Sequence, residues 1–308
     1  MSTISLDNIC AIIVTYNIGK QINDNIATYI DQVHKFYIID NHSDDDTIEA
    51  LCLLKNSYNK ISIIFNKDNQ GLAAAQNIGI KLAMKDGYDW ILFLDHDSRP
   101  HENMISNMSA LYNSLSEDKK QLIAIIAPRI IDINTQKEYT ILLQSRFFFK
   151  RQYCVAPYSE NIVSVMNSGS LIKTEVFTKL GLFEEKLFID YVDHDLCLRI
   201  ISNHLSIIAV YDAIMYHELG KRKNYNLLKI SISPTFHNYL RRYYIYRNRI
   251  YTWKKYHYIH CFLTFDISAA CYDLFRILIF ENDKSIKLLY IYRGIRDSLH
   301  NKFGVYSK

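Results

Sequence analysis

Short hydrophobic runs, rich in β-branched residues, recur through the first hundred positions and end in polar residues. They cover residues 9–16, 35–40, 61–65 and 90–94. Uninterrupted apolar runs of this length are typical of strands buried on both faces of a parallel sheet. The segments between them have helical patterns or helix-forming compositions, and these lie at about 20–33, 47–56 and 72–84. This alternation predicts βαβ units and a doubly wound α/β sheet with its ligands at the carboxyl ends of the strands.

The second half of the chain is less regular. Three further runs predict strands, at 122–127, 164–172 and 207–211, and two predict helices, at 175–180 and 193–203. From about Ser233 the pattern is helical, with Tyr and Arg interleaved. The most apolar stretch, Tyr256 to Phe280, contains His, Asp and Arg residues, so we expect no membrane-spanning helix. The first residues show no basic start followed by an apolar run, so a secretory signal is not expected.

The charge is unevenly distributed along the 308 residues. Residues 1–219 hold 19 Lys or Arg against 27 Asp or Glu, whereas residues 220–308 hold 17 against 5. We therefore expect a catalytic domain over 1–225 and a basic, aromatic and helical region over 226–308, which we predict to be membrane-associated. A basic tail suits an anionic partner such as a membrane surface, a lipid-linked pyrophosphate or a nucleic acid. The acidic body and the absence of a recognisable nucleic-acid-binding module argue against the last. The six cysteines form no CxxC pair, which is typical of free thiols in a reducing cytosol.

The strongest chemical candidate is the triplet Asp95-His96-Asp97, which directly follows a predicted strand. Two carboxylates two residues apart at a strand end can share a divalent cation and face a pyrophosphate. Oxygen ligands suit Mn²⁺ and Mg²⁺. The alternative is an Asp-rich surface loop, but the strand running into the triplet favours the metal site. His217 also follows a predicted strand, and a neutral imidazole would suit Mn²⁺ as a third ligand, although a lone His is more often structural.

Two other strand ends offer groups for a nucleotide. Asp40 can accept a hydrogen bond from N3–H of a uracil or thymine ring, while Asp45 or Asp46 can cap the following helix. Gly71, in the segment 69–77, permits a tight turn and the close approach of a ligand, or it begins an ordinary helix. The chain has neither a Walker A motif nor GxGxxG, so we expect no ATP or NAD site.

A third acidic group lies at 190–195, where Asp190, Asp193 and Asp195 stand among apolar residues. A sugar hydroxyl needs a carboxylate base to take its proton during attack. Asp193 and Asp195 cannot share one helical face, so we expect them to differ in role; the alternative is an ordinary acidic helix N-terminus. In the tail, Arg241, Arg242, Arg247 and Arg249 predict either contacts with a diphosphate or anionic lipid heads, or a solvated helix face with tyrosines packed inward.

Together these motifs resemble the inverting family 2 glycosyltransferases of the GT-A fold, and in particular the rhamnosyltransferases that build bacterial O-antigens and other surface polysaccharides. The resemblance covers nearly the whole chain in order. Its segments are 13–17, 39–41, 69–73, 77–80, 91–98, 167–172, 181–185, 188–199, 243–248 and 292–297. Two departures are His96, where the branch often has Gln, and the Asp193-His194-Asp195 triplet, where Asp-Thr-Glu is commoner.

The resemblance implies a GT-A, Rossmann-like, mostly parallel sheet with a helical C-terminal extension, and a role for each site residue. Asp193 would be the catalytic base, and attack would be direct, with inversion at the anomeric carbon. The metal, Mn²⁺ or Mg²⁺, would be held by Asp95, Asp97 and His217. Donor-binding residues would be Thr15, Tyr16, Asn17, Asp40, Asn41, Asn69, Gly71, Asn77 and Asp95. Acceptor or phosphate contacts would come from Asp195, Arg199, Arg241, Arg242 and Arg247.

The expected reaction is transfer of L-rhamnose from dTDP-rhamnose to a lipid-linked oligosaccharide. A galactosyl or glucosyl transferase using a UDP-hexose is the nearest alternative. A nucleotidyltransferase, a non-catalytic nucleotide-sugar-binding protein and a structural scaffold are further alternatives. We expect a cytoplasmic protein that is peripheral at the inner face of the plasma membrane. It should not bind nucleic acid, and a homo-oligomer is one expected assembly.

Overall fold

The computed structural model describes residues 3–133, 135–217, 225–227, 230–232 and 236–307. The chain divides into two compact units, each assembled from segments distant in the sequence. Unit 1 consists of Met1–Leu143, Arg151–Glu185 and Val192–Glu218, and unit 2 consists of Gln144–Lys150, Lys186–Tyr191 and Leu219–Lys308.

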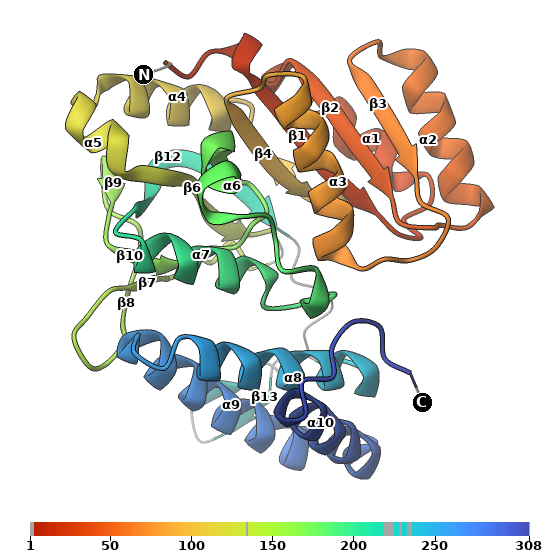
Figure 1. Ribbon diagram of the computed structural model, residues 1–308, viewed down its shortest axis with the longest axis vertical. Coiled ribbons are helices and arrows are strands. Elements are labelled where there is room, and N and C mark those ends of the chain that lie inside the picture. Colours follow the sequence, from red (N-terminus) through yellow and green to blue (C-terminus); the bar gives the residue numbers. More distant parts are fainter. Residues whose placement is uncertain (1–2, 134, 218–224, 228–229, 233–235, 308) are drawn as a thin grey trace. The chain divides into compact units, whose positions relative to one another are not determined.

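Unit 1 contains a large mixed sheet (Figure 1). Its strands run in the order β3-β2-β1-β4-β11-β6-β12-β5, with β9 paired to β12. The four strands predicted first are confirmed and pair in parallel, whereas β11 is antiparallel to both of its neighbours. The strand bounds are β1 Ile9–Thr15, β2 Lys35–Asp40, β3 Ile61–Phe65, β4 Trp90–Asp95, β5 Arg99–Pro100, β6 Ile123–Asp132, β9 Tyr158–Ser159, β11 Leu171–Lys173 and β12 Ser206–His217.

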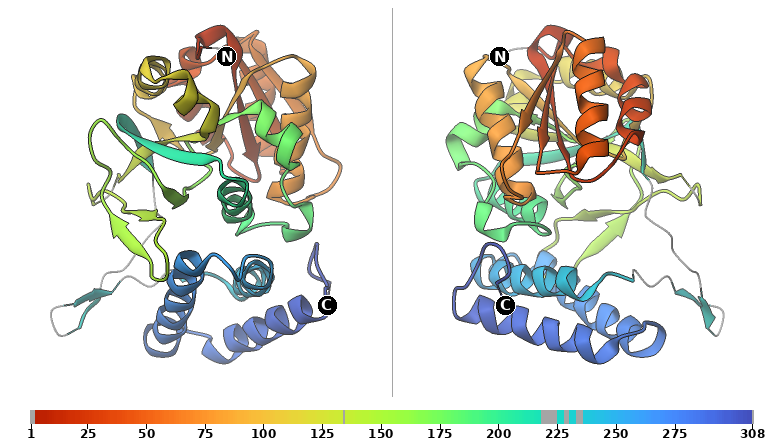
Figure 2. Two further views of the ribbon diagram at one scale, coloured as in Figure 1. Left: turned by 60° about the vertical axis from the view of Figure 1, so that its left-hand side comes forward. Right: turned by 90° about the vertical axis from the view of Figure 1, so that its right-hand side faces the viewer.

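Helices cover both faces of this sheet, as Figures 1 and 2 show. Because side chains alternate along a strand, Ile9, Ala11 and Ile13 pack with α1, α2 and α4 in one apolar core. Ile12 faces the other way, and a Cβ at Gly79 of α3 would come within 2.7 Å of it. Only glycine therefore allows α3 this close to β1. The helices are α1 Gln21–Ala27, α2 Asp45–Ser57, α3 Leu72–Lys85, α4 Met104–Ser114, α5 Glu117–Leu122, α6 Thr174–Leu180 and α7 Val192–Ser202.

Several predicted bounds change for identifiable reasons. The single strand expected at 164–172 is two strands, β10 Ile162–Ser164 and β11, because Gly169 turns the chain with a φ of 81°. Strand β12 runs past the predicted end at 211 through a register shift opposite β6, and it reaches His217. Helix α2 is capped by Asp44, not by Asp45 or Asp46 as predicted. Residues 104–122, where no helix was predicted, form α4 and α5. A smaller sheet has the order β10-β7-β8, with β7 Ile141–Leu143 and β8 Lys150–Gln152.

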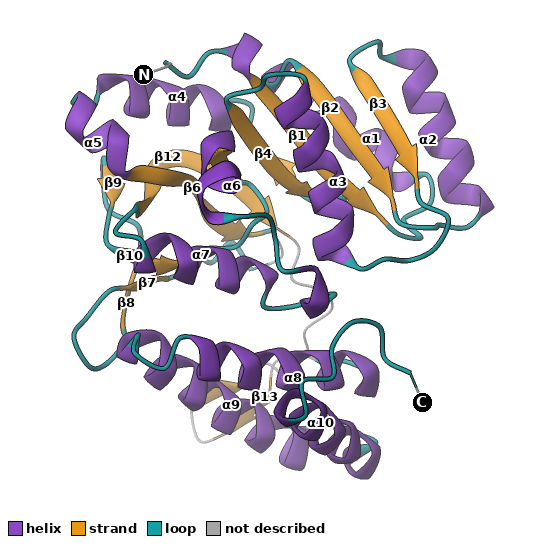
Figure 3. Cartoon of the chain, viewed as in Figure 1, coloured by secondary structure: helices purple, strands orange, loops and turns teal. Residues whose placement is uncertain are grey.

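Unit 2 consists mainly of helices, which are drawn in purple in Figure 3. These are α8 Tyr239–Lys255, α9 His260–Phe280 and α10 Lys284–Leu299. The helical expectation for 226–308 is wrong at its start, because β13 Tyr225–Leu227 and β14 Ile230–Ile232 form a hairpin. Over the residues that the structure describes, no helix has the length and apolar content needed to cross a membrane.

The segment 186–191 belongs to unit 2 and immediately precedes α7 in the chain. Arg247 donates to the carbonyls of Lys186 and Leu187, and Asn248 donates to the carbonyls of Leu187, Ile189 and Asp190. Both side chains are fully buried. Buried carbonyls need such partners in place of water, so these two residues of α8 fix the backbone that leads into α7.

Candidate functional site

The parallel register aligns the polar residues at the strand ends. Thr15 of β1 lies opposite Asp40 of β2, and the preceding residue of β1, Val14, lies opposite Asp95 of β4. The carboxyl ends of β1, β2 and β4 therefore present their polar groups at one edge of the sheet. This is the edge where doubly wound sheets bind ligands.

Asp40 is the centre of a buried hydrogen-bond network. Its carboxylate accepts hydrogen bonds from the Thr15 hydroxyl at 2.9 Å, from the Ser43 hydroxyl at 2.5 Å and from the Ser43 amide at 2.9 Å. Ser43 in turn accepts a hydrogen bond from the Asn17 amide. This network fixes the chain after β1, where Tyr16 is 49% exposed and Asn17 adopts a φ of 50°. An exposed aromatic ring beside fixed polar groups suits a nucleobase.

Asn41 and Asn69 connect the end of β2 to the loop before α3. The Asn41 amide group donates to Asn69 and accepts from the backbone of Gln70, and Asn69 accepts from the backbone of Gly71. Gly71 has a φ of 85°, a conformation that glycine adopts without strain. Gly71 is the N-cap of α3, so it begins that helix as the alternative expectation had it, and the asparagines hold the loop in place.

Asn77 lies in the middle of α3 with 1% of its surface exposed. Its side chain bonds both the amide and the carbonyl of Phe183 at 3.0 Å and also the Glu185 carboxylate at 2.9 Å. These contacts give Asn77 a structural role, and its predicted contact with the donor stays a prediction.

The loop after β4 is held by groups outside the acidic triplet. The Asp95 amide donates to Ser98 and Ser168, whose hydroxyls share a short hydrogen bond. Asn25 of α1 donates to the carbonyl of His96 at 2.8 Å. None of these three residues belongs to the chemical motifs of the sequence, although Ser98 and Ser168 lie in segments that carry the family resemblance. Their positions on distant elements explain why local spacing could not connect them.

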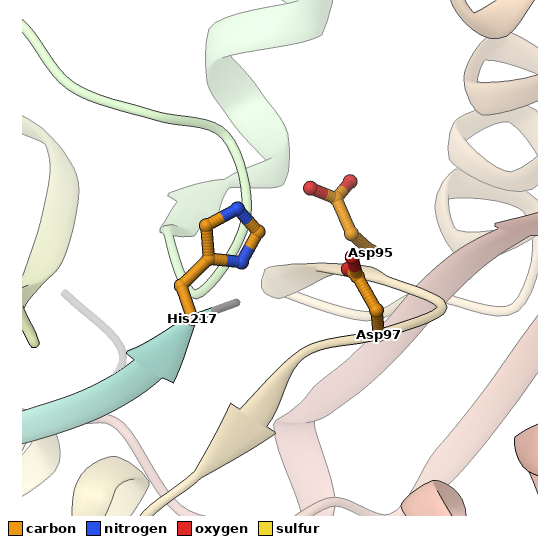
Figure 4. A group of neighbouring side chains, drawn as sticks. All are labelled: Asp95, Asp97 and His217. Carbon is orange, nitrogen blue, oxygen red and sulfur yellow. The ribbon is translucent and has the colours of Figure 1, made fainter. Parts of the chain in front are cut away.

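Asp95, Asp97 and His217 converge in unit 1, as Figure 4 shows. One carboxylate oxygen from each aspartate and one ring nitrogen of His217 lie within 4.8 Å of one another. Among the described residues, Nδ1 of His217 is buried without a hydrogen-bond partner. A buried polar atom is normally paired, so this nitrogen fits a ligand that the chain itself does not supply. Two oxygens and one imidazole nitrogen form a donor set that suits Mn²⁺ or Mg²⁺.

The electrostatics of this group also favour a cation. Burial, and next the neighbouring Asp97 carboxylate, raise the pKa of Asp95 above its usual value, and His217 opposes the shift in part. Asp193 is close enough for its carboxylate to raise this pKa further. The charged form of Asp95 is therefore destabilised in the folded, metal-free protein, and a bound divalent cation would relieve this repulsion.

We expect Asp95→Asn to raise the melting temperature of the metal-free protein while abolishing its stabilisation by Mn²⁺. A raised pKa in the folded state means that ionisation of Asp95 opposes folding. The gain should thus be absent at acid pH, where Asp95 is protonated in both states, grow as the pH rises from the ordinary carboxyl range towards the raised pKa, and stay constant above it. About 1 kcal/mol corresponds to roughly 2–4 °C in a chain of this size. Thermal melts with and without Mn²⁺ across a pH series measure this, and the exposed Asp68→Asn is the control. A lower melting temperature for Asp95→Asn without metal would contradict it.

Residues 193–199 lie in the first two turns of α7. Asp193 is half-buried, and one of its oxygens accepts a hydrogen bond from the amide of His194 at 2.8 Å. Asp195 is fully buried and forms an ion pair with Arg199 at 3.1 Å. Arg199 also donates to the carbonyls of Leu180 and Gly181. Asp193 and Asp195 thus lie in different environments, and the different roles expected for them stay a prediction. The acceptor or phosphate contacts of Asp195 and Arg199 stay predictions, because both side chains are engaged within unit 1.

The tail arginines lie in unit 2. Arg241 is exposed and pairs with Asp190 at 3.1 Å. Arg242 and Arg247 are buried, and their guanidinium groups bond other groups of unit 2. Burial keeps Arg242 and Arg247 away from solvent and from any external anion. These two residues therefore form neither a solvated arginine face nor an exposed row of phosphate ligands. Sequence spacing could not separate Arg241 from Arg242, since both interrupt the same run of tyrosines.

Comparisons with known proteins agree with this geometry. The profile of "Glycosyl transferase family 2" matches residues 10–181. A dTDP-rhamnosyl transferase, RfbF of Shigella flexneri, is 30% identical over 256 residues, which cover 81% of each chain.

Two solved structures resemble this chain in fold. One is a mannosyltransferase from Pyrobaculum calidifontis in complex with GDP-Man and Mn²⁺, with a TM-score of 0.54, 13% identity and coverage of 96% of this chain and 78% of the other. The second is GalNAc-T7 with UDP, GalNAc and Mn²⁺, with a TM-score of 0.54, 16% identity and coverage of 73% of this chain. The chain spans less than half of GalNAc-T7, at 44%.

The fold class expected from the sequence is confirmed: a mixed α/β sheet flanked by helices, with GT-A glycosyltransferases among its structural neighbours. The profile covers more than half of the chain, and the Shigella relative supports the same assignment over most of its length. The chain is a glycosyltransferase and belongs to glycosyl transferase family 2.

Proposed function

We propose that this enzyme transfers L-rhamnose from dTDP-rhamnose to a lipid-linked oligosaccharide during the assembly of O-antigen or another surface polysaccharide. The observation that carries the donor is the 30% identity over 81% of the chain to a dTDP-rhamnosyl transferase. The pyrimidine follows from that relative: Asp40 would accept the N3–H of thymine, and because its carboxylate is buried and already accepts from Thr15 and Ser43, this contact requires the network to open when the nucleotide binds. Uracil has the same N3–H group, so a UDP-hexose is the second candidate donor.

The donor would lie along the carboxyl ends of β1, β2 and β4. Thr15, Tyr16, Asn17 and Asp40 would contact the nucleotide, and Asn41, Asn69 and Gly71 would shape the loop beside it. Asp95, Asp97 and His217 would hold Mn²⁺ or Mg²⁺, which when bound stabilises the negative charge of the leaving diphosphate. His217 brings the one buried, unpartnered nitrogen at this group of residues, which supports its place among the ligands.

Asp193 would accept the proton of the acceptor hydroxyl as that oxygen attacks the anomeric carbon. The new glycosidic bond forms as the bond to the diphosphate breaks, and attack from the opposite face inverts the configuration. The half-buried carboxylate of Asp193 supports this role, because it lies near the acidic group and has no cationic partner among the contacts described for it. The catalytic domain would span residues 1–225. The region 226–308 would keep the enzyme at the inner face of the plasma membrane, and the enzyme would form a homo-oligomer.

A donor panel tests the proposal. With Mn²⁺ present, we expect turnover of dTDP-rhamnose to exceed that of UDP-galactose, UDP-glucose and GDP-mannose by about tenfold or more, in the range that small differences between substrates allow. Transfer or slow hydrolysis is measured as nucleoside diphosphate released, with a chelator-treated sample as the control. Preferential turnover of a UDP-hexose would overturn the rhamnosyl assignment while leaving the family and the site in place.

A further inference from the structure

Helix α9 of unit 2 has its charges on the inside. Its charged residues are Asp266 and Asp273, which are 4% and 5% exposed, and Arg276, which pairs with Asp273 at 2.8 Å. The exposed residues instead fall on one face at helical spacing, and none is Lys, Arg, Asp or Glu. These residues, which we call the α9 face, are His260, Ile267, Ser268, Cys271, Tyr272, Phe275, Leu278 and Ile279. A helix exposed to water normally shows the reverse pattern.

Three consecutive phenylalanines lie beside the N-terminal half of this helix. Phe149 packs against Phe265 with ring centroids 5.6 Å apart, and Phe147 stacks on His260 at 6.4 Å. Phe148, between them, is 73% exposed. The phenylalanines extend the α9 face into one apolar and aromatic surface. Contiguous exposed surfaces of this kind mark interaction sites, and rings that are part apolar and part polar are favoured where water meets lipid.

The exposed charge on the three helices of unit 2 and the segments that join and follow them is almost all positive. Residues 236–308 contain 13 Lys or Arg and five Asp or Glu. Four of the five acidic residues are buried, and within the described part of this stretch only Asp283 exposes its carboxylate. The exposed cations are Arg241, Lys254, Lys284, Arg296 and Lys302. The helices therefore present apolar residues and positive charge to solvent, with little negative charge to oppose an anionic surface.

We propose that the α9 face and Phe147–Phe149 form a docking surface for an anionic lipid bilayer, with α9 lying in the plane of the headgroups. The proposal rests on the proposed function, because a lipid-linked acceptor resides in such a bilayer. It goes further by naming the residues that enter the lipid. Charge selects the lipid over a second copy of the chain, since a second copy would bring the same positive surface against this one.

Two native cysteines allow a direct test. Cys271 lies within the α9 face, and Cys52 lies on α2 of unit 1; both are exposed. An environment-sensitive fluorophore is attached to Cys271 in a Cys52→Ser protein, and to Cys52 in a Cys271→Ser protein. With vesicles that contain phosphatidylglycerol, we expect the emission of the Cys271 label to shift to shorter wavelength, and that of the Cys52 label to stay unchanged. No shift at Cys271, or equal shifts at both sites, would overturn the proposal.

A second pair of variants tests the apolar contribution. Leu278 on the α9 face and Leu53 on α2 are similarly exposed, at 49% and 53%. We expect Phe148→Ser/Leu278→Ser to weaken sedimentation with these vesicles by about tenfold or more, because two large apolar side chains no longer enter the lipid. Leu53→Ser should leave sedimentation unchanged. Thermal melts confirm that the variants fold.

The alternatives give different results. If a second copy covered the α9 face, analytical ultracentrifugation without lipid would show a dimer that Phe148→Ser/Leu278→Ser dissociates, and the proposal would be wrong. Hydrolysis of dTDP-rhamnose in lipid-free solution reports separately on the proposed function. Donor turnover without vesicle binding would contradict this inference alone, and vesicle binding without turnover of any nucleotide sugar would contradict the proposed function alone.

Discussion

Asp193→Asn should lower sugar transfer by about 10²- to 10⁴-fold, the range over which a positioned general base accelerates a reaction. Asparagine has the same shape as aspartate but cannot take the proton of the attacking hydroxyl. Its side-chain oxygen can still accept the hydrogen bond that Asp193 accepts from the amide of His194, so the start of α7 should be preserved. The measurement is the rate of transfer to a lipid-linked or synthetic acceptor at saturating donor.

Donor binding separates a catalytic role for Asp193 from a structural one. Asp193 is not one of the three candidate metal ligands, Asp95, Asp97 and His217, so its substitution should leave the set of groups that would hold Mn²⁺ intact. We expect the thermal shift of Asp193→Asn with Mn²⁺ and dTDP to equal that of the unaltered enzyme. The exposed Asp212→Asn, which removes the same charge elsewhere in unit 1, should keep full activity. Near-normal transfer by Asp193→Asn would refute its assignment as the base.

The strand-end residues could be predicted because their signal is local. A buried parallel strand is a continuous apolar run, and the first polar residue after it marks the sheet edge where ligands bind. Asp40 and Asp95 each follow such a run, and the parallel register then places them on neighbouring strands near one edge. His217 was found by the same reasoning, although its strand is longer than predicted. The register shift in β12 between Val210 and Ile214 carries the strand past Asp212, the polar residue that follows its predicted end.

The supports of the site could not be predicted because their partners are distant in the chain. Ser168 contacts the Asp95 amide across 73 residues, and Asn25 contacts His96 across 71. Single serines and asparagines have no periodic signal, since their role depends on which backbone groups the fold leaves unpaired. Asn248 is a similar case: it bonds carbonyls about 60 positions earlier. Family resemblance marked some of these segments, but only the three-dimensional contacts give them a physical function.

The exposure of the arginines in the tail could not be predicted from the charge pattern for a related reason. A helix rich in Arg and Tyr and a net positive region predict a solvated cationic face. Burial instead depends on acidic partners from other helices, and Arg242 finds Asp273 on α9 and Glu281 just after it. These partners draw the carboxylates inward as well, which leaves the outside of α9 uncharged. The net charge of the tail predicts an anionic partner, whereas the surface that would meet such a partner depends on which charges are paired inside.

Arg242→Met should destabilise the protein by about 3–5 kcal/mol, the usual effect of removing one member of a buried ion pair. Arg242 is 1% exposed and bonds the carboxylates of Asp273 and Glu281. Without it, the ion-pair partners that remain within the described part of the chain are Arg276 for Asp273, at 2.8 Å, and Lys287 for Glu281, at 2.9 Å. Methionine fills much of the volume, so the loss comes mainly from uncompensated charge. The measurement is the free energy of unfolding in urea, followed by a far-ultraviolet signal that reports the helices.

The neighbouring Arg241 provides the matched control. Its side chain is 47% exposed and pairs with Asp190, and an exposed pair contributes at most about 1 kcal/mol. Arg241→Met should therefore change the unfolding free energy far less than the same substitution one residue later. If uncompensated charge is the cause, Arg242→Met/Asp273→Asn should recover part of the stability, because the second change removes one of the carboxylates left without its partner. Equal effects of the two single substitutions, or a further loss in the double variant, would show that the buried network does not stabilise unit 2.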